Sequence, residues 1–478
     1  MKRCSAWLVV SFFWLSMACP PAILAQETQT KASSVKDSME SGSAVDWATI
    51  ETLDLDTTVA IALSGNPGLM AAVARVNQAK AQVDQARSTY WPSLDANASA
   101  ARVEMSTNTY EENMATVRYF NPNATIDNPD DYYNADLTAS WILFNGFERK
   151  FSNLAARYGE KNSTAALKDA QRLLISSVAQ SYFSAQLALE NIAIAKADEA
   201  FNQRQLNDAK ARQRVGTGSL SDVLNFQVRG NQAKTKRINE EYQYKITLFG
   251  LAALMGLSEA RLPDHVELAR LAPETATELS TPQVNQLITN AMDRRPDIKQ
   301  VQWGIKQTEA QIKVAQADYY PSVVVSGSVE GERSGDIHFG QDDFGNRVAL
   351  GLSYNLFSGG YTKAKVSEAR HQKVELEKNL EELILSTASD IRSSAALVAT
   401  AQTQVTLQRE NVDLVQRTRD LVEKEYNAGQ GSLVRLNEAQ KDLTTAQGNL
   451  AQALVALRQA WIELETRTGS ILATYAAP

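Results

Sequence analysis

The chain has 478 residues, of which 44% are hydrophobic and 22% charged, a composition typical of an ordered protein. Its formal net charge is −7 at pH 7, which argues against nucleic-acid binding, because affinity for phosphate needs clustered Lys and Arg. After the N-terminal region, no segment approaches about 18 unbroken apolar residues, so we expect no transmembrane helix.

The first 25 residues are organised like a secretory signal peptide. Lys2 and Arg3 precede an apolar run at 7–18, and Ala25 offers a small residue for cleavage. We expect residues 1–25 to be removed after Ala25. This takes away two cations and no acid, and brings the formal charge to −9. The sequence therefore predicts an exported, acidic protein.

Both cysteines, Cys4 and Cys19, lie inside this segment, so the mature chain is expected to have no thiol and no disulfide. Cys19 leaves one alternative open. The segment Ser16-Met17-Ala18-Cys19 would serve as a lipoprotein cleavage site that acylates Cys19, but the large aliphatic residue that usually lies three positions before the cysteine is missing.

Residues 26–46 are polar and read as a flexible leader. Residues 47–89 are expected to be helical with a break at Asn66-Pro67, because proline suits the first turn of a new helix. Pro92 should end this helical region, and Pro296 and Pro321 repeat the pattern later in the chain.

Apolar and polar residues then alternate with a period of two, which is typical of strands with one polar face. Such segments occur at 94–103 (the weakest), 137–143, 323–330 and 348–356. Polar loops at 104–135 and 331–346 separate them, and we expect these loops to face the cell exterior.

Each strand pair is followed by a long proline-free stretch, at 146–216 and 359–429. At about 1.5 Å per residue, a helix of this length would reach roughly 100 Å. Apolar residues in these stretches and in the helix after 431 are spaced alternately by three and four, as in coiled coils. The expected seams are Leu174, Val178, Ser181, Ala185, Ala188, Ile192 and Ala195; Thr387, Ile391, Ser394, Val398, Ala401, Val405 and Gln408; and Leu436, Ala439, Leu443, Ala446, Leu450, Ala453, Leu457, Ala460 and Leu464.

The two halves of the chain match each other. Tyr90-Trp91-Pro92-Ser93 returns as Tyr319-Tyr320-Pro321-Ser322 at an offset of 229, and Leu143-Phe144-Asn145-Gly146 returns as Leu356-Phe357-Ser358-Gly359 at an offset of 213. A tandem duplication is therefore predicted, and its length difference falls in the loop region, where insertions are tolerated. The expected organisation is a first repeat at 47–262, a linker at 263–282, a second repeat at 283–470 and a C-terminal tail at 471–478.

Four strands per chain cannot by themselves form a membrane-spanning structure, since their edge amides would remain unpaired in lipid. A barrel closes only if several chains share strands: two chains would supply eight and three would supply twelve. An eight-stranded barrel is filled by its own side chains, so a conduit needs more. Aromatic residues near the strand ends are expected to lie at the membrane interface. They are Tyr90, Trp91, Trp141, Tyr319, Tyr320 and Tyr354.

Taken together, these motifs resemble the TolC family of outer-membrane efflux and secretion channels over essentially all of residues 47–470. The likeness is carried by Asn66-Pro67-x-Leu69, Arg295-Pro296-Asp297-Ile298, the two Pro-Ser and Phe-x-Gly landmarks, Gly216 with Ser221-Asp222-Val223-Leu224, and Tyr426-Asn427-Ala428-Gly429. The resemblance implies an α+β membrane protein. In it, a trimeric 12-stranded β-barrel continues into a 12-helix periplasmic α-barrel of coiled-coil hairpins.

The resemblance also implies a periplasmic gate near the hairpin tips, where the family has an Asp-x-x-Asp pair. The aligned residues here are Arg435 and Glu438, and their first-half counterparts are Asp222 and Asn225. A Glu ring crossed by an Arg ring would form ion pairs between chains; alternatively, all four residues are solvated hairpin positions. The tips, which the resemblance implies dock the adaptor, are Gly216, Thr217, Gly218, Gly429, Gln430 and Gly431.

No nucleophile, phosphate-loop or dinucleotide motif stands in a fitting context, so no enzyme is expected. His265, His338 and His371 match no metal spacing, and we expect neither a metal nor a cofactor. The predicted function is a passive exit duct in the outer membrane for small-molecule efflux or type I protein secretion. The implied partners are a periplasmic adaptor and an inner-membrane pump of the RND or ABC type. The alternative is a structural periplasmic coiled-coil envelope protein without a pore.

Overall fold

The computed structural model of the protein describes Trp47 and residues 50–475. The predicted signal peptide with Cys19, the predicted leader and the last three residues of the predicted tail lie outside this part. The described chain forms two compact units. The hairpin unit contains the residues up to Pro67 together with Leu174–Leu279 and Thr400–Ile462, and the sheet unit contains Gly68–Leu173, Ser280–Ala399 and the residues from Glu463.

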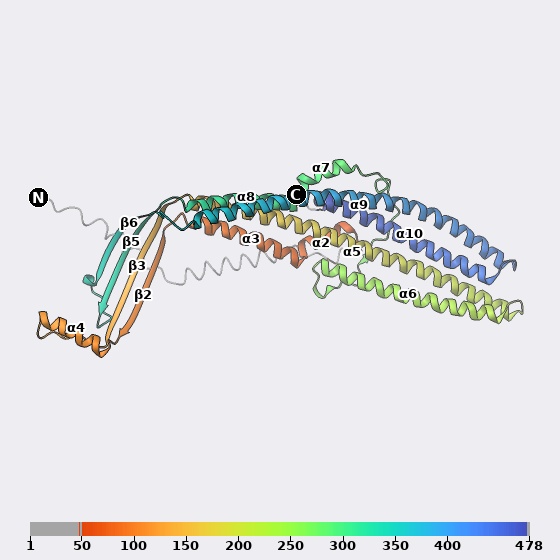
Figure 1. Ribbon diagram of the computed structural model, residues 1–478. Helices are drawn as coiled ribbons and strands as arrows, with labels where there is room; N and C mark the ends of the chain where they lie inside the picture. The colour runs from red at the N-terminus through yellow and green to blue at the C-terminus, as the bar shows by residue number, and fades with distance from the viewer. Residues whose placement is uncertain (1–46, 48–49, 476–478) are drawn as a thin grey trace. The chain divides into compact units, whose positions relative to one another are not determined.

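The sheet unit contains a four-stranded antiparallel sheet with the order β2-β3-β5-β6 (Figure 1). Its strands are β2 (Ser93–Val103), β3 (Asp130–Asn145), β5 (Ser322–Ser334) and β6 (Phe344–Ser353). Strands of 10 to 16 residues are long enough to cross a bilayer, which takes about 9–11 residues. The two outer strands, β2 and β6, have no second partner within the described chain.

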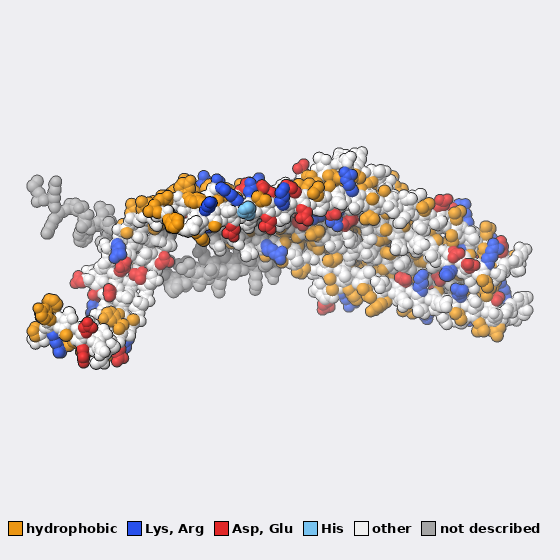
Figure 2. Space-filling view, in the orientation of Figure 1, with side chains coloured by type: hydrophobic (Ala, Val, Ile, Leu, Met, Phe, Trp, Pro, Cys, Tyr) orange, Lys and Arg blue, Asp and Glu red, His pale blue; other side chains and the backbone are white. Residues whose placement is uncertain are grey.

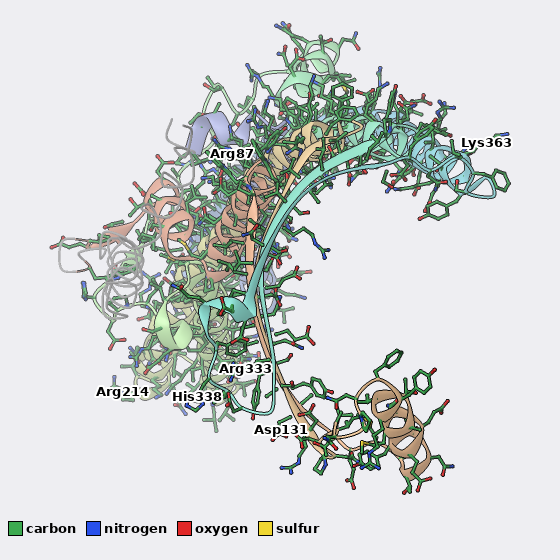
Figure 3. All side chains as sticks on the ribbon, turned by 90° about the vertical axis from the view of Figure 1, so that its left-hand side faces the viewer. Arg87, Asp131, Arg214, Arg333, His338 and Lys363 are labelled. Atoms are coloured by element: carbon green, nitrogen blue, oxygen red, sulfur yellow. The ribbon has the colours of Figure 1, made fainter. Side chains whose placement is uncertain are left out.

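The register explains how the sheet keeps two chemically different faces. Leu137 lies opposite Ala96 and Val329, and Asp136 lies opposite Asn97 and Glu330. One irregularity, between Ile142 and Phe144, interrupts the β3–β5 ladder. The strands follow curved paths in Figure 3, with Asp131 and Arg333 at one end of the sheet and Lys363, near the start of α9, beyond the other.

The sheet unit also contains helices. They are α3 (Pro67–Ser88), α4 (Thr107–Phe120), α7 (Val284–Arg294), α8 (Pro296–Ala317) and α11 (Ile471–Tyr475), with the short η4 (Gln341–Asp343). As expected, α3 and α8 begin at a proline. The loop expected at 104–135 is shorter, because β3 starts at Asp130, and it contains the unpredicted α4. The last predicted strand, 348–356, was placed too late in the sequence, since β6 begins at Phe344 and ends at Ser353.

The hairpin unit is helical. It contains α2 (Leu55–Gly65), α6 (Leu220–Leu254) and η3 (Ser258–Ala260), and it shares α5 (Glu148–Arg214), α9 (Tyr361–Asn427) and α10 (Leu433–Thr468) with the sheet unit. Helices α5 and α9 have 67 residues each, so each measures roughly 100 Å along its axis. The predicted seams are largely buried, including Val178, Ala185, Ile391, Val405 and Leu436.

Part of the segment predicted as a linker has regular structure. Strand β4 (Glu267–Leu268) pairs in parallel with β1 (Thr52–Leu53), which was not predicted. Glu278 accepts a hydrogen bond from Arg458 Nε over 3.0 Å, and Glu274 pairs with Arg409. These contacts hold the segment against α9 and α10 within the hairpin unit.

The element order α2, α3, β2, β3, α5, α6 is followed by α7, α8, β5, β6, α9, α10, with α4 as an addition in the first series. The compact units cut across this order, and the boundaries of the two repeats stay a prediction. Among the described helices, none alone has the length and apolar character to cross a membrane. The bent pair α2 and α3, which meet at 47°, meets that criterion only when taken together.

Candidate functional site: the two-faced sheet and the hairpin tips

One face of the sheet is apolar. On β6, Val348, Leu350 and Leu352 have 85%, 70% and 72% of their surface exposed. The register places them beside Gly327, Val325 and Val323 of β5, respectively. Further residues of this face include Leu94, Ala96 and Ala98 of β2, Ala135, Leu137 and Ala139 of β3, and Val329 of β5. An exposed apolar face of this width needs a cover, and lipid is one.

The opposite face is polar and acidic (Figure 2 shows acidic side chains along the strands). Asn97 Nδ2 donates to Asp136 Oδ2 over 3.0 Å, Ser93 Oγ lies 2.9 Å from Ser140 Oγ, and Ser328 Oγ donates to Glu330 Oε1 over 2.7 Å. Charged residues of this face include Asp95, Asp136, Glu330, Glu332 and Arg347. Alternation of this kind matches barrels that are apolar outside and polar inside.

The six predicted interfacial aromatics lie together at one end of the sheet. This end contains the starts of β2 and β5 and the ends of β3 and β6. Trp141 Nε1 donates to the Tyr90 carbonyl over 3.0 Å, and Arg149 lies 5.2 Å from the Tyr90 ring centre. All six are substantially exposed, Trp91 most of all at 77%. Their location at a membrane interface stays a prediction.

The two predicted hairpin tips have the same local structure. The N–H groups of Thr217 and Gly218 both donate to the Arg212 carbonyl, over 3.0 and 3.1 Å. The N–H groups of Gln430 and Gly431 donate to the Glu425 carbonyl in the same way, over 2.9 and 3.0 Å. Gly216 and Gly429 have φ angles of +79° and +76°, which residues with a Cβ rarely adopt. The glycines therefore allow each long helix to end and reverse.

The four predicted gate residues lie just beyond these tips, on α6 and α10. Arg435 Nη1 pairs with Glu425 Oε2 over 2.9 Å within the chain, and both side chains are exposed. Glu438 is exposed, whereas Asn225 Oδ1 accepts a hydrogen bond from the buried Asn437 over 3.0 Å. A pair as exposed as Arg435–Glu425 contributes about 0–1 kcal/mol. The gating role of these residues stays a prediction.

Sequence reasoning missed the contacts that join the two hairpins. Tyr426 donates a hydrogen bond to Asp222 Oδ2 over 3.3 Å, and Arg212 Nη2 donates to Asn427 Oδ1 over 2.9 Å. The Arg212 guanidinium also lies 5.0 Å from the Tyr426 ring centre. Burial, followed by the negative charge of Asp222, raises the pKa of Tyr426, so its hydroxyl remains a donor. Nothing in the sequence motif Tyr426-Asn427 indicates these partners.

A shared hydrophobic cluster supports these contacts. It contains Phe226, which is fully buried and meets the Tyr426 ring edge to face at 6.3 Å. The other members come from α5, α6, α9 and α10. They are Phe201, Leu206, Ala209, Val223, Val422, Leu436 and Ala439. The tip therefore has a packed hydrophobic core, and hydrogen bonds link the first hairpin to the second.

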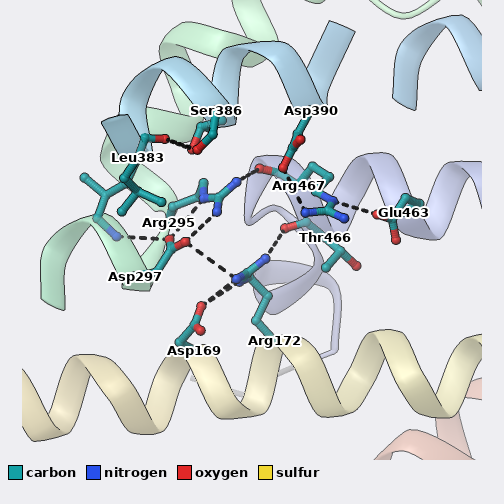
Figure 4. A network of polar contacts seen from close by, with 12 residues as sticks. Asp169, Arg172, Arg295, Asp297, Leu383, Ser386, Asp390, Glu463, Thr466 and Arg467 are labelled. Atoms are coloured by element: carbon teal, nitrogen blue, oxygen red, sulfur yellow. Dashed lines mark hydrogen bonds and ion pairs between the residues drawn. The ribbon is translucent and has the colours of Figure 1, made fainter. Parts of the chain in front are cut away.

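A buried arginine pair lies in the sheet unit (Figure 4). Arg172 Nη1 donates to the Thr466 carbonyl over 2.9 Å, and Arg295 Nη1 donates to the Arg467 carbonyl over 3.0 Å. Both guanidinium groups thus satisfy carbonyls in the last turn of α10, where positive charge is favourable. Asp297 pairs with Arg295 and lies 3.8 Å from Arg172 Nη2.

These contacts determine the ionisation of Asp297. Its burial alone would raise the pKa, but the hydrogen bond and charge of Arg295, together with the charge of Arg172, outweigh burial and lower the pKa. Asp169 accepts from Arg172 Nε over 2.8 Å. The Arg295-Pro296-Asp297 motif therefore joins α8 to α5 and α10, a function that its sequence did not reveal.

No group of three or more His, Cys, Asp or Glu side chains among the described residues is arranged to hold a metal ion. The three histidines lie in separate surroundings, and His265 Nε2 is 2.8 Å from the Trp47 carbonyl.

Comparison with known proteins gives consistent matches along the chain. The family model described as outer membrane efflux protein matches residues 59–257 and 287–470. The pyoverdine export outer membrane protein OpmQ of Pseudomonas aeruginosa is 25% identical over 429 residues, which cover 88% of this chain and 86% of the relative. Outer membrane protein TolC of Escherichia coli is 22% identical over 403 residues, which cover 81% of this chain and 76% of that protein.

The crystal structure of the CmeC outer membrane channel of Campylobacter jejuni aligns with a TM-score of 0.70 at 18% identity, covering 87% of this chain and 85% of CmeC. The fold is therefore the α+β channel-tunnel fold, as the resemblance to TolC predicted, and the protein is located in the outer membrane. Because the family model matches most of its length, this chain belongs to the outer membrane efflux protein family.

Proposed function

We propose that the protein acts as a homotrimeric outer-membrane channel, a passive exit duct that docks on an inner-membrane pump through a periplasmic adaptor. The observation that carries the proposal is the sheet with one apolar face, one acidic face and two free edges. The relatives support an export channel, whereas nothing supports the alternative of an envelope protein without a pore. We assign no reaction to the chain.

The free edges support oligomerisation. Every residue of β2 and of β6 is exposed in the single chain, and each strand has one edge of unpaired backbone N–H and C=O groups. Lipid does not tolerate such edges, so β2 of one chain must pair with β6 of another. Three chains close a twelve-stranded barrel, which is wide enough to leave an aqueous lumen lined by the acidic face.

Cysteine cross-linking tests this arrangement, because the chain has no cysteine after Cys19. Ala98→Cys on β2 is combined in turn with Val348→Cys, Leu350→Cys and Leu352→Cys on the same face of β6. We expect at least one pair to give, on oxidation, a denaturing-gel ladder that ends at three chains. Each single variant should remain a monomer on the gel. A ladder ending at two chains, or continuing beyond three, would contradict the trimer.

Closure of the duct is proposed to depend on the hairpin tips. The ties from Tyr426 to Asp222 and from Arg212 to Asn427 hold the two hairpins of one chain together, and Arg435 and Glu438 are proposed to face their copies around the axis. Separation of the hairpins would open the duct. The glycine turns at 216–218 and 429–431 are proposed to dock the adaptor.

Conductance in planar bilayers tests the duct itself. Purified trimers should insert and form discrete channels, whereas folded trimers that never conduct would contradict the proposal. Because a passive duct takes its cargo from its pump, cargo should change when the partner transporter is exchanged.

A further inference from the structure

The sheet unit contains a pocket that the channel function does not use. It lies between α5, the beginning of α8 and α11, and has a volume of about 700 Å³. Helices α5 and α8 are joined beside it, where Asn162 Nδ2 donates to the Gln300 carbonyl over 2.8 Å. Pockets for small molecules usually measure about 300–1,000 Å³, so this volume suits a small molecule rather than a protein segment.

The pocket is strongly basic. Four cations line it, Lys161 and Lys168 from α5, Arg294 from α7 and Lys299 from α8, and no carboxylate of the described residues does. None of the four forms an ion pair with a carboxylate in the described part of the chain. Within the described residues, their positive charge is therefore not balanced by a carboxylate.

Two half-buried acids that adjoin pocket residues in the sequence are already engaged. Asp169 accepts from Arg172, and Asp297 pairs with Arg295, so neither is free to neutralise the pocket. Uncompensated like charges repel one another, and a bound anion relieves that repulsion.

One wall of the pocket is aromatic. Trp303 lines it and stacks on Tyr158, with ring centres 5.9 Å apart and planes inclined by 22°. The ammonium groups of Lys161 and Lys306 lie 4.5 and 4.4 Å from the Trp303 ring centre. The indole is thus held in place, and with Leu472 it offers apolar surface beside the cations.

We propose that this pocket binds a small polyanion, one that carries at least two carboxylate or phosphate groups on a flat or apolar framework. The cations would pair with the acidic groups, and the framework would pack against Trp303 and Leu472. Lys161 and Lys168 lie roughly four and six turns into α5, on the order of 20–30 Å along the helix from the base of β3. If β3 spans the membrane as proposed above, this distance favours a soluble anion over a lipid headgroup.

Isothermal titration calorimetry of the full-length detergent-solubilised protein tests the proposal. The probe is trimesate (benzene-1,3,5-tricarboxylate) in about 150 mM salt, where weak surface attraction is screened. We expect saturable binding of one trimesate per chain. The uncharged benzene-1,3,5-tricarboxamide should not bind, and the non-aromatic propane-1,2,3-tricarboxylate should bind more weakly.

Two variants locate the site. Lys161→Gln with Lys168→Gln should weaken trimesate binding by roughly tenfold or more, because two charged contacts are lost. Trp303→Leu should weaken trimesate binding more than that of the non-aromatic tricarboxylate. Lys210→Gln with Lys245→Gln makes the same change of charge on exposed positions of α5 and α6, and should leave binding unchanged.

Trimer size on gel filtration and the far-ultraviolet circular dichroism spectrum confirm that each variant folds. Absence of saturable binding, or equal weakening by both lysine pairs, would overturn the proposal. The binding measurement does not require an open pore. A protein that binds trimesate but forms no channel would contradict the proposed function alone, and the reverse result would contradict this inference alone.

Discussion

The hydrogen bond between Tyr426 and Asp222 offers the sharpest test of the proposed tip closure. Tyr426→Phe removes only the hydroxyl, which donates over 3.3 Å, and keeps the ring that packs against Phe226 and Arg212. A hydrogen bond to a carboxylate contributes about 1.5–3 kcal/mol, and the length of this one and the partial exposure of Asp222 reduce that to about 1 kcal/mol.

If opening breaks this contact in each of three chains, the variant loses about 3 kcal/mol of closed-state stability per trimer. Since about 1.4 kcal/mol corresponds to a factor of ten, the ratio of open to closed channels should rise by roughly 100-fold. Single-channel recordings in planar bilayers measure that ratio directly.

Tyr242→Phe, on α6 at a position that is 66% exposed, is the matched control and should behave as the unmodified protein. Asp222→Ala should resemble Tyr426→Phe, and the double variant should add little to either, because both remove the same contact. The reasoning is refuted if Tyr426→Phe trimers of normal size have the same open fraction as the unmodified channel.

Arg435→Ala or Glu438→Ala should raise single-channel conductance and antibiotic permeability without dissociating the trimer; unchanged conductance and ion selectivity in both would leave them as solvated residues. Arg172→Met should lower the free energy of unfolding by about 3 kcal/mol, since it leaves Asp169 without its cation and removes a charged donor from the Thr466 carbonyl; urea denaturation followed by circular dichroism should detect the loss. The pKa of Asp297 is lower in the folded protein than its unfolded value of 3.8. Its ionised carboxylate therefore contributes fully to folding stability above pH 3.8, and this contribution is lost as the pH falls through the folded pKa. The gap in melting temperature between the unmodified protein and Asp297→Asn should therefore narrow below about pH 4, and a gap that is constant with pH would contradict this.

The local pattern of the sequence determined much of the architecture. Alternation at 323–330 and 348–356 predicted strands because side chains of a strand point alternately to opposite faces. Spacings of three and four predicted buried seams because they place residues on one side of a helix, and Val178, Ile391 and Leu436 are buried as expected. The glycine turns were visible for a similar reason, since a helix reversal needs a backbone conformation that glycine adopts easily.

Elements with a weak sequence pattern were predicted poorly or not at all. Strand β2 is rich in Ala and Ser, and its eleven paired residues with β3 define it more than its own composition does. Helix α4 lies in a polar stretch with few apolar residues to mark it, and only Met114 is buried. Strands β1 and β4 have two residues each and exist because distant segments meet.

Only the tertiary structure shows which polar residues contact one another. Asp222 and Tyr426 are 204 positions apart, and Arg172 and Thr466 are 294 apart. Lys161 and Lys299 share a pocket although nothing near either one in sequence indicates it. A periodic pattern reports which face of an element is buried, but not which element packs against it. Partners of this kind depend on long-range packing, so the sequence alone could indicate the channel fold but not the contacts proposed to close it.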